Sequence, residues 1–379
     1  MDIQIDQNSM VPKHKQLCDQ IEKLIRQGVW QEGHKLPSEN QLQEKLNISR
    51  STVRQALQAM ESSGLIEKIT GKGSFVRARQ NRSGSLIGII ASNLNREYHH
   101  KILLGAEDTA RQNGYNIIFG NSHGDLTEET EILNQFLAHN VKGIILWPAI
   151  QNLYHPEKLL AIRNSGIPVV VLDRIIPGVP LDTVLSDNFD GTYKASEFLI
   201  KNGHRKIYFI TRPILSLTSI SERYNGYRQA MEDNGLVPAE PVLVGEANRE
   251  MTTEDFPLRE GSDEYLAVSR FIRDQKPEAV VAMNDIMALN VMHIAADRGI
   301  RVPDQMSVVG FDRRDIGSSY RIPLTSVFQD AYRIGTESAD LIFRSIREQQ
   351  QEPQIIRLPV ELVVRDSARI LRRKGMTGT

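Results

Sequence analysis

The sequence has little of what an exported or membrane-anchored protein needs. Its 379 residues include one cysteine, Cys18, which excludes an intramolecular disulfide and any metal or redox motif built from several cysteines. No run of 18 or more apolar residues occurs, so no transmembrane helix and no membrane partner are expected. The first residues lack the positively charged segment of a secretory signal. We therefore expect a protein of the reducing cytoplasm.

An excess of one charge sign is also lacking, because 46 Lys and Arg nearly balance 47 Asp and Glu. This balance hides a difference between the two ends of the chain. Residues 1–85 carry about 13 basic and about 9 acidic side chains, as expected for a nucleic-acid-binding module fused to an acidic soluble module. Random variation in composition is the alternative. The length predicts two or three globular domains.

The first 80 residues contain the signals of three helices and a hairpin. Ser38 and Gln41 form the Ser-x-x-Gln pattern of a capping box, in which each residue satisfies a backbone N–H of the other. Ser49 is suited to cap the helix that follows it. The predicted helices cover residues 12–27, 38–46 and 50–63, and the predicted strands cover 65–69 and 74–77 with a turn between them.

The third predicted helix has two chemically different faces. One face is apolar, and the other carries hydrogen-bond donors without a single acid. Such a face suits a negatively charged partner with acceptor atoms, such as DNA, although an ordinary solvated face is the alternative. The apolar face consists of Val53, Ala56, Leu57 and Met60, and the donor face consists of Arg50, Ser51, Arg54, Gln55 and Gln58.

The predicted hairpin has a basic, glycine-rich tip. Gly71 and Gly73 allow the backbone to approach phosphates closely, and Lys72 lies between them. The nucleotide-binding P-loop, G-x-x-x-x-G-K-[ST], would need Ser or Thr at the position of Gly73, so we reject that interpretation. A donor-rich helix followed by such a hairpin predicts a winged helix-turn-helix.

Residues 10–78 closely resemble the GntR family of bacterial transcription regulators. The matching strings are Leu36-Pro37-Ser38-Glu39, Ser49 to Leu57, Gly64-Leu65-Ile66 and Gly71 to Val76. The resemblance implies a double-stranded operator DNA partner, contacted by Ser49, Arg50, Ser51, Thr52, Arg54 and Gly71. We add Lys72 because it lies at the tip. Capping and packing are the alternative roles for Ser49 and Thr52. A further DNA contact of the family, an arginine in the second helix, falls on Asn40 here.

From residue 86 onward, short apolar runs alternate with amphipathic stretches. Buried strands with helical crossovers predict parallel sheets covered by helices on both faces. About 280 residues exceed one core, so we expect two α/β lobes. Residues 79–85 are predicted to be a linker. The predicted strands are 86–91, 116–120, 143–147, 169–172, 206–210, 279–283 and 307–311, and the predicted helices are 103–113, 128–139, 195–201, 224–234 and 287–298.

Polar side chains follow several of these strands. Asp173 and Arg174 come directly after one strand, and Asn284 and Asp285 after another. Ligands of such folds bind beyond the carboxyl ends of the strands. Carboxylates, guanidinium groups and amides suit sugar hydroxyls, and aromatic rings suit the C–H face of a sugar. Loop caps or salt bridges between lobes are the alternative.

Residues 86–365 resemble the sensor domain of the LacI family and of ribose-type periplasmic binding proteins. The matching strings include residues 92–98, 166–174, 202–207, 284–288 and 308–312. The resemblance implies a two-lobed, type I periplasmic-binding-protein-like domain with a sugar, a monosaccharide or derivative, between its lobes. Carried over by position, the sugar contacts are Arg96, Tyr98, His99, Asp173, Arg174, Arg223, Asp285 and Gln329. The first loop differs from that of the ribose binders, so simple ribose is not expected.

We therefore predict a GntR-type head (1–78), a linker (79–85) and a LacI-type effector-binding and dimerisation domain (86–379). This order of parts resembles regulators of the arabinose-repressor type. The predicted function is a homodimeric repressor of carbohydrate-utilisation genes, released from its operator by a sugar. We expect no enzyme activity, cofactor or metal, because no catalytic or nucleotide-binding motif is found. A carbohydrate-active enzyme and a sugar-binding protein without a regulatory role are the alternatives.

Overall fold

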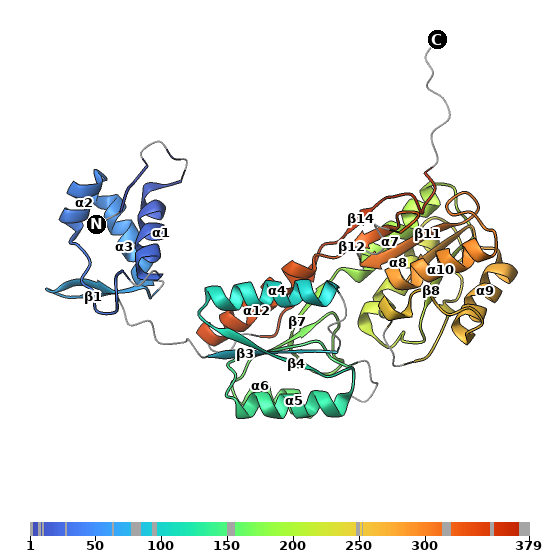
Figure 1. Ribbon diagram of the computed structural model, residues 1–379, viewed down its shortest axis with the longest axis horizontal. Coiled ribbons are helices and arrows are strands. Elements are labelled where there is room, and N and C mark those ends of the chain that lie inside the picture. The colour runs from blue at the N-terminus through green and yellow to red at the C-terminus, as the bar shows by residue number, and fades with distance from the viewer. Residues whose placement is uncertain are drawn as a thin grey trace, which may run out of the picture. The chain divides into compact units, whose positions relative to one another are not determined.

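The chain forms two compact units, Met1–Gly84 and Ser85–Thr379. The computed structural model (Figure 1) describes residues 3–6, 9, 11–26, 29–62, 64–76, 85–92, 97–149, 156–247, 251, 253–312, 320–348 and 352–370. The predicted linker lies outside these residues, with the exception of Ser85.

The first unit contains the three helices and the hairpin that the sequence predicts. The capping box is confirmed, because Gln41 N–H donates to Ser38 Oγ while Ser38 N–H donates to Gln41 Oε1. The cap of the third helix is confirmed as well, since Thr52 N–H donates to Ser49 Oγ at 3.1 Å. The elements are α1 (Lys13–Arg26), α2 (Glu39–Leu46), α3 (Arg50–Ser62), β1 (Ile66–Ile69) and β2 (Gly73–Val76).

The strands β1 and β2 pair as an antiparallel hairpin with a glycine-dependent turn. Gly71 has a φ of 75° and Gly73 a φ of 113°, which lie in a region that L side chains rarely adopt. A bridge between Lys35 and Phe75 ties the hairpin to the segment before α2. The predicted winged helix-turn-helix is therefore present.

The second unit contains two α/β lobes, each built on a six-stranded sheet (Figure 1). The first lobe has an all-parallel sheet with the strand order β13-β7-β6-β5-β3-β4. Helices α4 and α12 cover one face, and α5 and α6 cover the other. Its elements are β3 (Leu86–Ala91), α4 (Glu97–Gln112), β4 (Asn116–Asn121), α5 (Leu126–Ala138), β5 (Ile144–Leu146), α6 (Pro156–Asn164), β6 (Val169–Leu172), β7 (Asp182–Ser186), α12 (Ala331–Glu348) and β13 (Ile355–Leu358).

The second lobe has the strand order β14-β12-β11-β10-β8-β9, in which only β14 runs antiparallel to its neighbour. Its elements are α7 (Asn188–Lys201), β8 (Ile207–Thr211), α8 (Thr218–Asp233), β9 (Val242–Leu243), η1 (Thr253–Asp255), α9 (Asp263–Gln275), β10 (Ala279–Ala282), α10 (Asp285–Asp297), β11 (Ser307–Asp312), β12 (Thr325–Phe328) and β14 (Glu361–Val363).

The chain crosses between the two lobes three times. It leaves the first lobe after β7, returns after β12, and leaves again between β13 and β14. Residues 187, 329–330 and 359–360 lie at these crossings. Three parallel crossings restrict relative motion of the lobes to bending at this hinge. The predicted two-lobed α/β fold is confirmed.

The predicted strands coincide with observed strands to within one residue at each end, whereas several helices begin earlier than predicted. Helix α4 begins at Glu97 rather than Leu103, and α8 begins at Thr218 rather than Tyr224. The first turns of these helices carry polar residues that do not show helical apolar periodicity. As a result, Tyr98 and His99 lie in the first turn of a helix and not in a loop.

Close helix pairs flank each sheet and depend on small residues. In the first lobe, α4 and α12 cross where Gly105 and Gly335 leave room for the facing backbone. In the second lobe, Gly226 of α8 does the same against α7. A Cβ atom at any of these positions would collide with a backbone carbonyl oxygen across the pair. These contacts fix the helices that deliver Tyr98 and Arg223 to the region between the lobes.

Candidate functional site

The N-terminal half of α3 presents the predicted donor face to solvent. The side chains of Arg50 and Arg54 are 63% and 62% exposed. They lie four residues apart, so both point from the same side of the helix. The opposite side is buried in the core of the head, with Val53, Ala56, Leu57 and Met60 as its members. The exposed arginines are therefore free of any packing role.

Three hydroxyl groups gather at the N-terminus of α3. Ser49 Oγ lies 2.8 Å from Ser51 Oγ and 2.7 Å from Thr52 Oγ1. Ser49 also caps the helix, as described above. The cluster is exposed at Ser49 and Ser51, and its hydroxyls can donate to acceptors of a partner. A hydroxyl has one donor and two acceptor sites, so a DNA contact by Ser49 would replace its contact with Ser51 or with the Thr52 hydroxyl and leave the cap intact.

Glu39, at the start of α2, gathers three basic side chains of the head. Its carboxylate lies 3.4 Å from Arg50 Nε, 3.4 Å from Arg54 Nη2 and 3.8 Å from Lys68 Nζ. Burial alone would raise the pKa of Glu39, but the Arg50 hydrogen bond and the charges of Arg54 and Lys68 lower it overall. The carboxylate stays ionised and holds both arginines of the donor face. The sequence analysis did not identify this residue as functional.

The hairpin adds further basic groups beside this cluster. Lys72 is exposed at the turn, next to Gly71. A hollow between α2, α3 and the hairpin is lined by Glu39, Arg54, Leu57, Gln58, Glu61, Ile66, Lys68 and Ser74. Every residue predicted to contact DNA therefore lies on α3, at its cap or at the turn of the hairpin.

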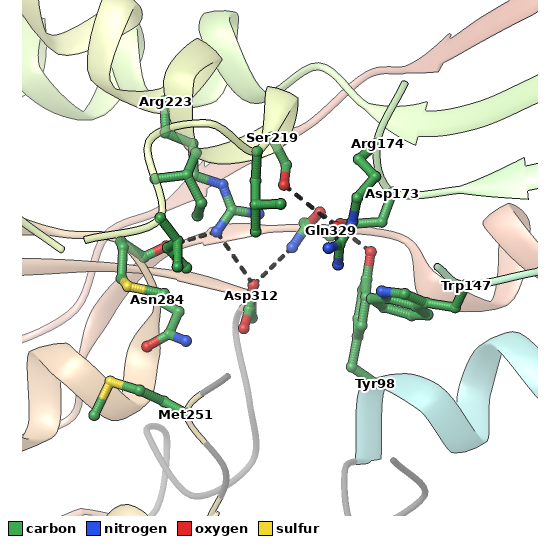
Figure 2. Close-up of a pocket in the computed structure, with 14 residues that line it drawn as sticks. Tyr98, Trp147, Asp173, Arg174, Ser219, Arg223, Met251, Asn284, Asp312 and Gln329 are labelled. Atoms are coloured by element: carbon green, nitrogen blue, oxygen red, sulfur yellow. Dashed lines mark hydrogen bonds and ion pairs between the residues drawn. The ribbon is translucent and has the colours of Figure 1, made fainter. Parts of the chain in front are cut away.

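The second unit has a cavity between its two lobes (Figure 2). It encloses about 500 Å³, part of which is open to solvent. The first lobe contributes an aromatic and polar wall, and the second lobe contributes polar and aliphatic side chains. The lining residues are Tyr98, Trp147, Asp173, Arg174, Ile214, Leu217, Ser219, Ile220, Arg223, Met251, Met283, Asn284, Asp312 and Gln329.

Aromatic rings form one side of this cavity. Tyr98 and Trp147 meet edge to face, with ring centroids 5.6 Å apart. His99 packs behind them, 4.1 Å from the Trp147 centroid, and does not line the cavity. Burial raises the pKa of Tyr98 well above its ordinary value, so its phenol stays protonated at neutral pH and can act as a donor.

A chain of polar contacts runs from Tyr98 across the hinge. Tyr98 Oη donates to Gln329 Oε1 at 3.2 Å, and Gln329 Nε2 donates to Asp312 Oδ1 at 2.7 Å. Gln329 lies directly after β12, at the second crossing between the lobes. Figure 2 shows these side chains converging on the middle of the cavity.

Arg223 continues this chain in the second lobe. Its guanidinium donates from Nε to Asn188 Oδ1 at 2.8 Å and from Nη1 to the Met283 carbonyl at 2.5 Å. Nη1 lies 3.8 Å from Asp312 Oδ1. The group also stacks on Phe311 at 3.7 Å. These four partners fix its orientation before any ligand arrives.

Asp173 and Arg174 line the cavity from the first lobe. Arg174 Nη2 lies 3.5 Å from Asp173 Oδ2, and Ser219 Oγ of the second lobe donates to Asp173 Oδ2 at 3.3 Å. Asp173 has a φ of 69°, a left-handed conformation that Asp and Asn tolerate better than other side chains. This turn at the end of β6 aims the carboxylate at the opposite lobe.

Two further contacts from the start of α8 bridge the lobes. Thr218 Oγ1 donates to the Ile175 carbonyl at 3.1 Å. Arg357 of β13 forms a bidentate pair with Glu222, at 3.0 and 2.8 Å. The Glu222 side chain is 17% exposed, and neither member of the pair lines the cavity. The lobes are therefore held together outside the cavity as well as across it.

Of the residues predicted to contact the ligand, Tyr98, Asp173, Arg174, Arg223 and Gln329 line the same cavity. Asp285 does not line it. Asp285 is fully buried, and its Oδ1 accepts from Ser326 Oγ at 2.6 Å. The preceding residue, Asn284, caps α10 and lines the cavity instead. Successive helical residues are rotated by about 100°, so the two side chains face different directions. Arg96 lies outside the described residues.

The sequence analysis did not assign several lining residues to the site. Trp147 follows β5 and Asp312 ends β11, so both fit the rule that ligands lie beyond strand ends. Ser219 and Met251 lie in segments without a sequence signal of this kind.

Within the described part of the chain, no cluster of three or more His, Cys, Asp or Glu could hold a metal ion, and no helix is long and apolar enough to cross a membrane.

Comparisons with known proteins give the head and the second unit separate matches. Residues 13–76 match the model of bacterial regulatory proteins of the gntR family, and residues 196–368 match a periplasmic binding protein-like domain. The fold and the two sites thus define a transcription regulator with a DNA-binding head and a ligand-sensing domain.

Whole-chain relatives agree with this class. The chain is 28% identical to the arabinose metabolism transcriptional repressor of Geobacillus stearothermophilus, covering 95% of this chain and 98% of the relative. It is 30% identical to the HTH-type transcriptional regulator DegA of Bacillus subtilis (strain 168), covering 75% and 80%. The chain belongs to the family of bacterial transcription regulators that carry a LacI-type sensor domain, here joined to a GntR-type head. The prediction that it is a regulator and not an enzyme is confirmed.

Solved structures show the same fold. The transcription regulator CcpA of Lactococcus lactis is 24% identical with a TM-score of 0.64, covering 75% of this chain and 99% of that chain. The lac repressor dimer bound to operator and an anti-inducer is 24% identical with a TM-score of 0.63, covering 77% and 95%.

We predict that Glu39→Gln lowers the discrimination between specific and non-specific DNA. Losing the ion pairs frees Arg50 and Arg54, and pairs of this exposure are worth about 0.2–1 kcal/mol each. Removing a negative charge also strengthens non-specific binding. Fluorescence anisotropy measures the dissociation constants for operator and for scrambled DNA. The constant for scrambled DNA divided by that for operator should fall about two- to tenfold. Glu32→Gln, which removes an exposed charge elsewhere in the head, should leave the ratio unchanged.

We also predict that Glu222 and Arg357 are energetically coupled across the lobes. In a double-mutant cycle with Glu222→Gln and Arg357→Gln, urea unfolding should give a coupling free energy of about 1 kcal/mol that decreases with added salt. The charge-swapped variant, Glu222→Arg with Arg357→Glu, should recover part of the stability that the single changes lose. Additive effects of the two single changes would show that the pair does not hold the lobes together.

Proposed function

We propose that this regulator is a repressor of carbohydrate-utilisation genes, released from its operator by a sugar bound between the lobes of the second unit. The composition of the cavity carries this proposal. Carboxylates, guanidinium groups and amides come from both lobes beside the rings of Tyr98 and Trp147, which is the chemistry that sugar hydroxyls and C–H groups need. The name of the Geobacillus stearothermophilus relative supports a role in sugar metabolism.

The ligand contacts are proposed on position and chemistry. Asp173 and Asp312 accept hydroxyl hydrogens, whereas Arg174 donates. The hydrogen of Tyr98 Oη goes to Gln329, so its phenol oxygen accepts from the sugar. Arg223 already has partners on two of its nitrogens, so it orients Asp312 and Asn188 as much as it binds the ligand. Of the predicted set, Tyr98, Asp173, Arg174, Arg223 and Gln329 are retained, Arg96 stays a proposal, Asn284 takes the place of Asp285, and His99 supports Trp147 from behind.

The head is proposed to bind operator DNA through residues 1–78. Arg50 and Arg54 would enter the major groove, with Ser49, Ser51 and Thr52 on neighbouring phosphates or bases and Gly71 and Lys72 at the wing. One small head makes few base contacts, so we propose a homodimer assembled through residues 86–379 that reads an approximately palindromic operator.

We propose that binding of the sugar weakens binding of operator DNA, and that operator DNA weakens binding of the sugar. A ligand that contacts both lobes gains affinity only in the closed arrangement, and closure bends the three crossings of the hinge. Such coupling is typically about 1–3 kcal/mol and acts equally on both affinities.

For DNA binding, we predict that Arg50→Ala or Arg54→Ala weakens specific operator binding by about 1–3 kcal/mol. Lys72→Ala should weaken binding to all sequences and reduce the salt dependence. Gel shifts with an operator selected from random DNA measure both effects. Operator binding that survives the double replacement of Arg50 and Arg54 would remove α3 from the recognition role.

For sugar binding, Asp173→Asn tests the site without disturbing the turn, because Asn also tolerates a positive φ. Losing a charged acceptor should weaken the sugar about 10- to 100-fold, equal to about 1.5–3 kcal/mol, while sugar-free operator affinity stays unchanged. A thermal-shift screen of mono- and oligosaccharides identifies the sugar, and calorimetry measures its affinity. Asp304→Asn, at an exposed site of the second lobe, is the control. Turnover of the sugar during incubation would contradict the regulator and indicate an enzyme.

A further inference from the structure

Glu129 is an acidic residue that is buried inside the first lobe. It lies in the first turn of α5 and is 1% exposed, whereas its neighbour Glu128 is exposed. A carboxylate inside a protein is costly unless it has hydrogen-bond partners. The start of α5 does not require it as a cap, because Asp125 already accepts from the N–H groups of Thr127 and Glu128. A role outside the helix is therefore indicated.

The carboxylate of Glu129 holds the chain that follows β5. Its Oε2 accepts from the Ala149 N–H at 2.8 Å. Two residues earlier, the Trp147 N–H donates to the Ile90 carbonyl of β3 at 2.8 Å. Pro148 lies between them and has no N–H to donate. Ala149 is thus the first residue after Trp147 whose N–H can anchor the chain, and its anchor is Glu129.

The indole of Trp147 depends on this backbone for its orientation. Its Nε1 is buried and has no hydrogen-bond partner among the described residues, so no hydrogen bond of its own fixes the ring. The ring is held by edge contacts with Tyr98 and His99, and Figure 2 shows it beside Tyr98 at the cavity. Such ring contacts are individually weak. A displacement of the backbone would therefore displace the indole as well.

We infer that Glu129 is a positioning residue of the candidate sugar site. It does not line the cavity. It acts through the Ala149 N–H, which fixes the course of the chain after β5 and with it the indole of Trp147. This role requires an acceptor oxygen within reach of Ala149, and it does not require the negative charge. The inference rests on the proposed function, in which the cavity is the sugar site.

Two substitutions separate the reach of the side chain from its charge. Glu129→Gln keeps the length and an acceptor oxygen but loses the charge. Glu129→Asp keeps the charge but is shorter by one carbon–carbon bond, about 1.5 Å. A hydrogen bond of 2.8 Å does not survive such a retraction, so Glu129→Asp releases Ala149.

The fluorescence of Trp147 reports the position of the indole in the absence of any sugar. The chain contains two tryptophans, and the other, Trp30, belongs to the core of the head. All variants are therefore made in the full-length protein with Trp30→Phe. Glu129→Asp should shift the emission of Trp147 to longer wavelength and increase its quenching by acrylamide. Glu129→Gln should leave both unchanged.

The affinity for sugar is the second readout. Calorimetry uses the sugar that stabilises the protein most in the thermal-shift screen. Glu129→Asp should weaken its binding about tenfold or more, and Glu129→Gln less than about threefold. Operator binding without sugar should be unchanged in both variants, because Glu129 is not part of the head.

Lys158→Met is the control for a general loosening of α5. Lys158 Nζ of α6 donates to the Thr130 carbonyl at 3.0 Å and to Asn134 Oδ1 at 2.8 Å, both in α5. Its loss weakens the attachment of α5 to α6 without touching Ala149. The variant should have a lower melting temperature and unchanged Trp147 fluorescence and sugar affinity.

Unchanged fluorescence in Glu129→Asp would overturn the inference. An equal shift in Glu129→Gln would also overturn it, because the charge would then be the cause, and so would an equal shift in Lys158→Met. If Glu129→Asp does not fold, Glu129→Gln decides, since a changed spectrum there overturns the inference and an unchanged one supports it. A shift without loss of sugar affinity would refute the role in sugar binding. Binding of no sugar at all would overturn the proposed function, whereas the effect on Trp147 is measured without sugar.

Discussion

The side-chain amide of Gln329 connects the two lobes of the second unit. It accepts from Tyr98 of the first lobe and donates to Asp312 of the second, and it lies where the chain crosses back after β12. The residue is 3% exposed, and losing one hydrogen bond in such surroundings costs about 1–3 kcal/mol. Any movement of the lobes must therefore preserve both partners or replace one, and a ligand that supplies the replacement selects one arrangement of the lobes.

Both candidate sites are prepared by partners within the protein. In the head, Glu39 holds Arg50 and Arg54 at the exposed face of α3. In the second unit, Asn188 and Phe311 hold Arg223 in place. Long basic side chains lose considerable conformational entropy when a ligand orders them. Because internal contacts already impose part of this order, less of it has to be supplied at the moment of binding.

The sequence predicted the framework well because buried strands and capping boxes leave strong local signals. It missed β7, β9, β12, β13 and β14, each of which is five residues long or shorter. Site residues at strand ends, such as Asp173, were found by their position along the chain. Asn284 lines the cavity in place of Asp285 because the two side chains differ by one step of helical rotation. Glu39 acts through Arg50, Arg54 and Lys68, which lie more than ten residues away in the sequence. Neither feature could be found from a local pattern.

The order of the elements also governs how the protein is made on the ribosome. The first lobe begins with β3, yet its core includes Ile334, Ile342 and Phe343 of α12 and Leu358 of β13. These residues are synthesised after almost the whole second lobe. The first lobe therefore has to wait with part of its apolar surface exposed until translation has passed residue 358, and this interval is when the nascent chain depends most on chaperones.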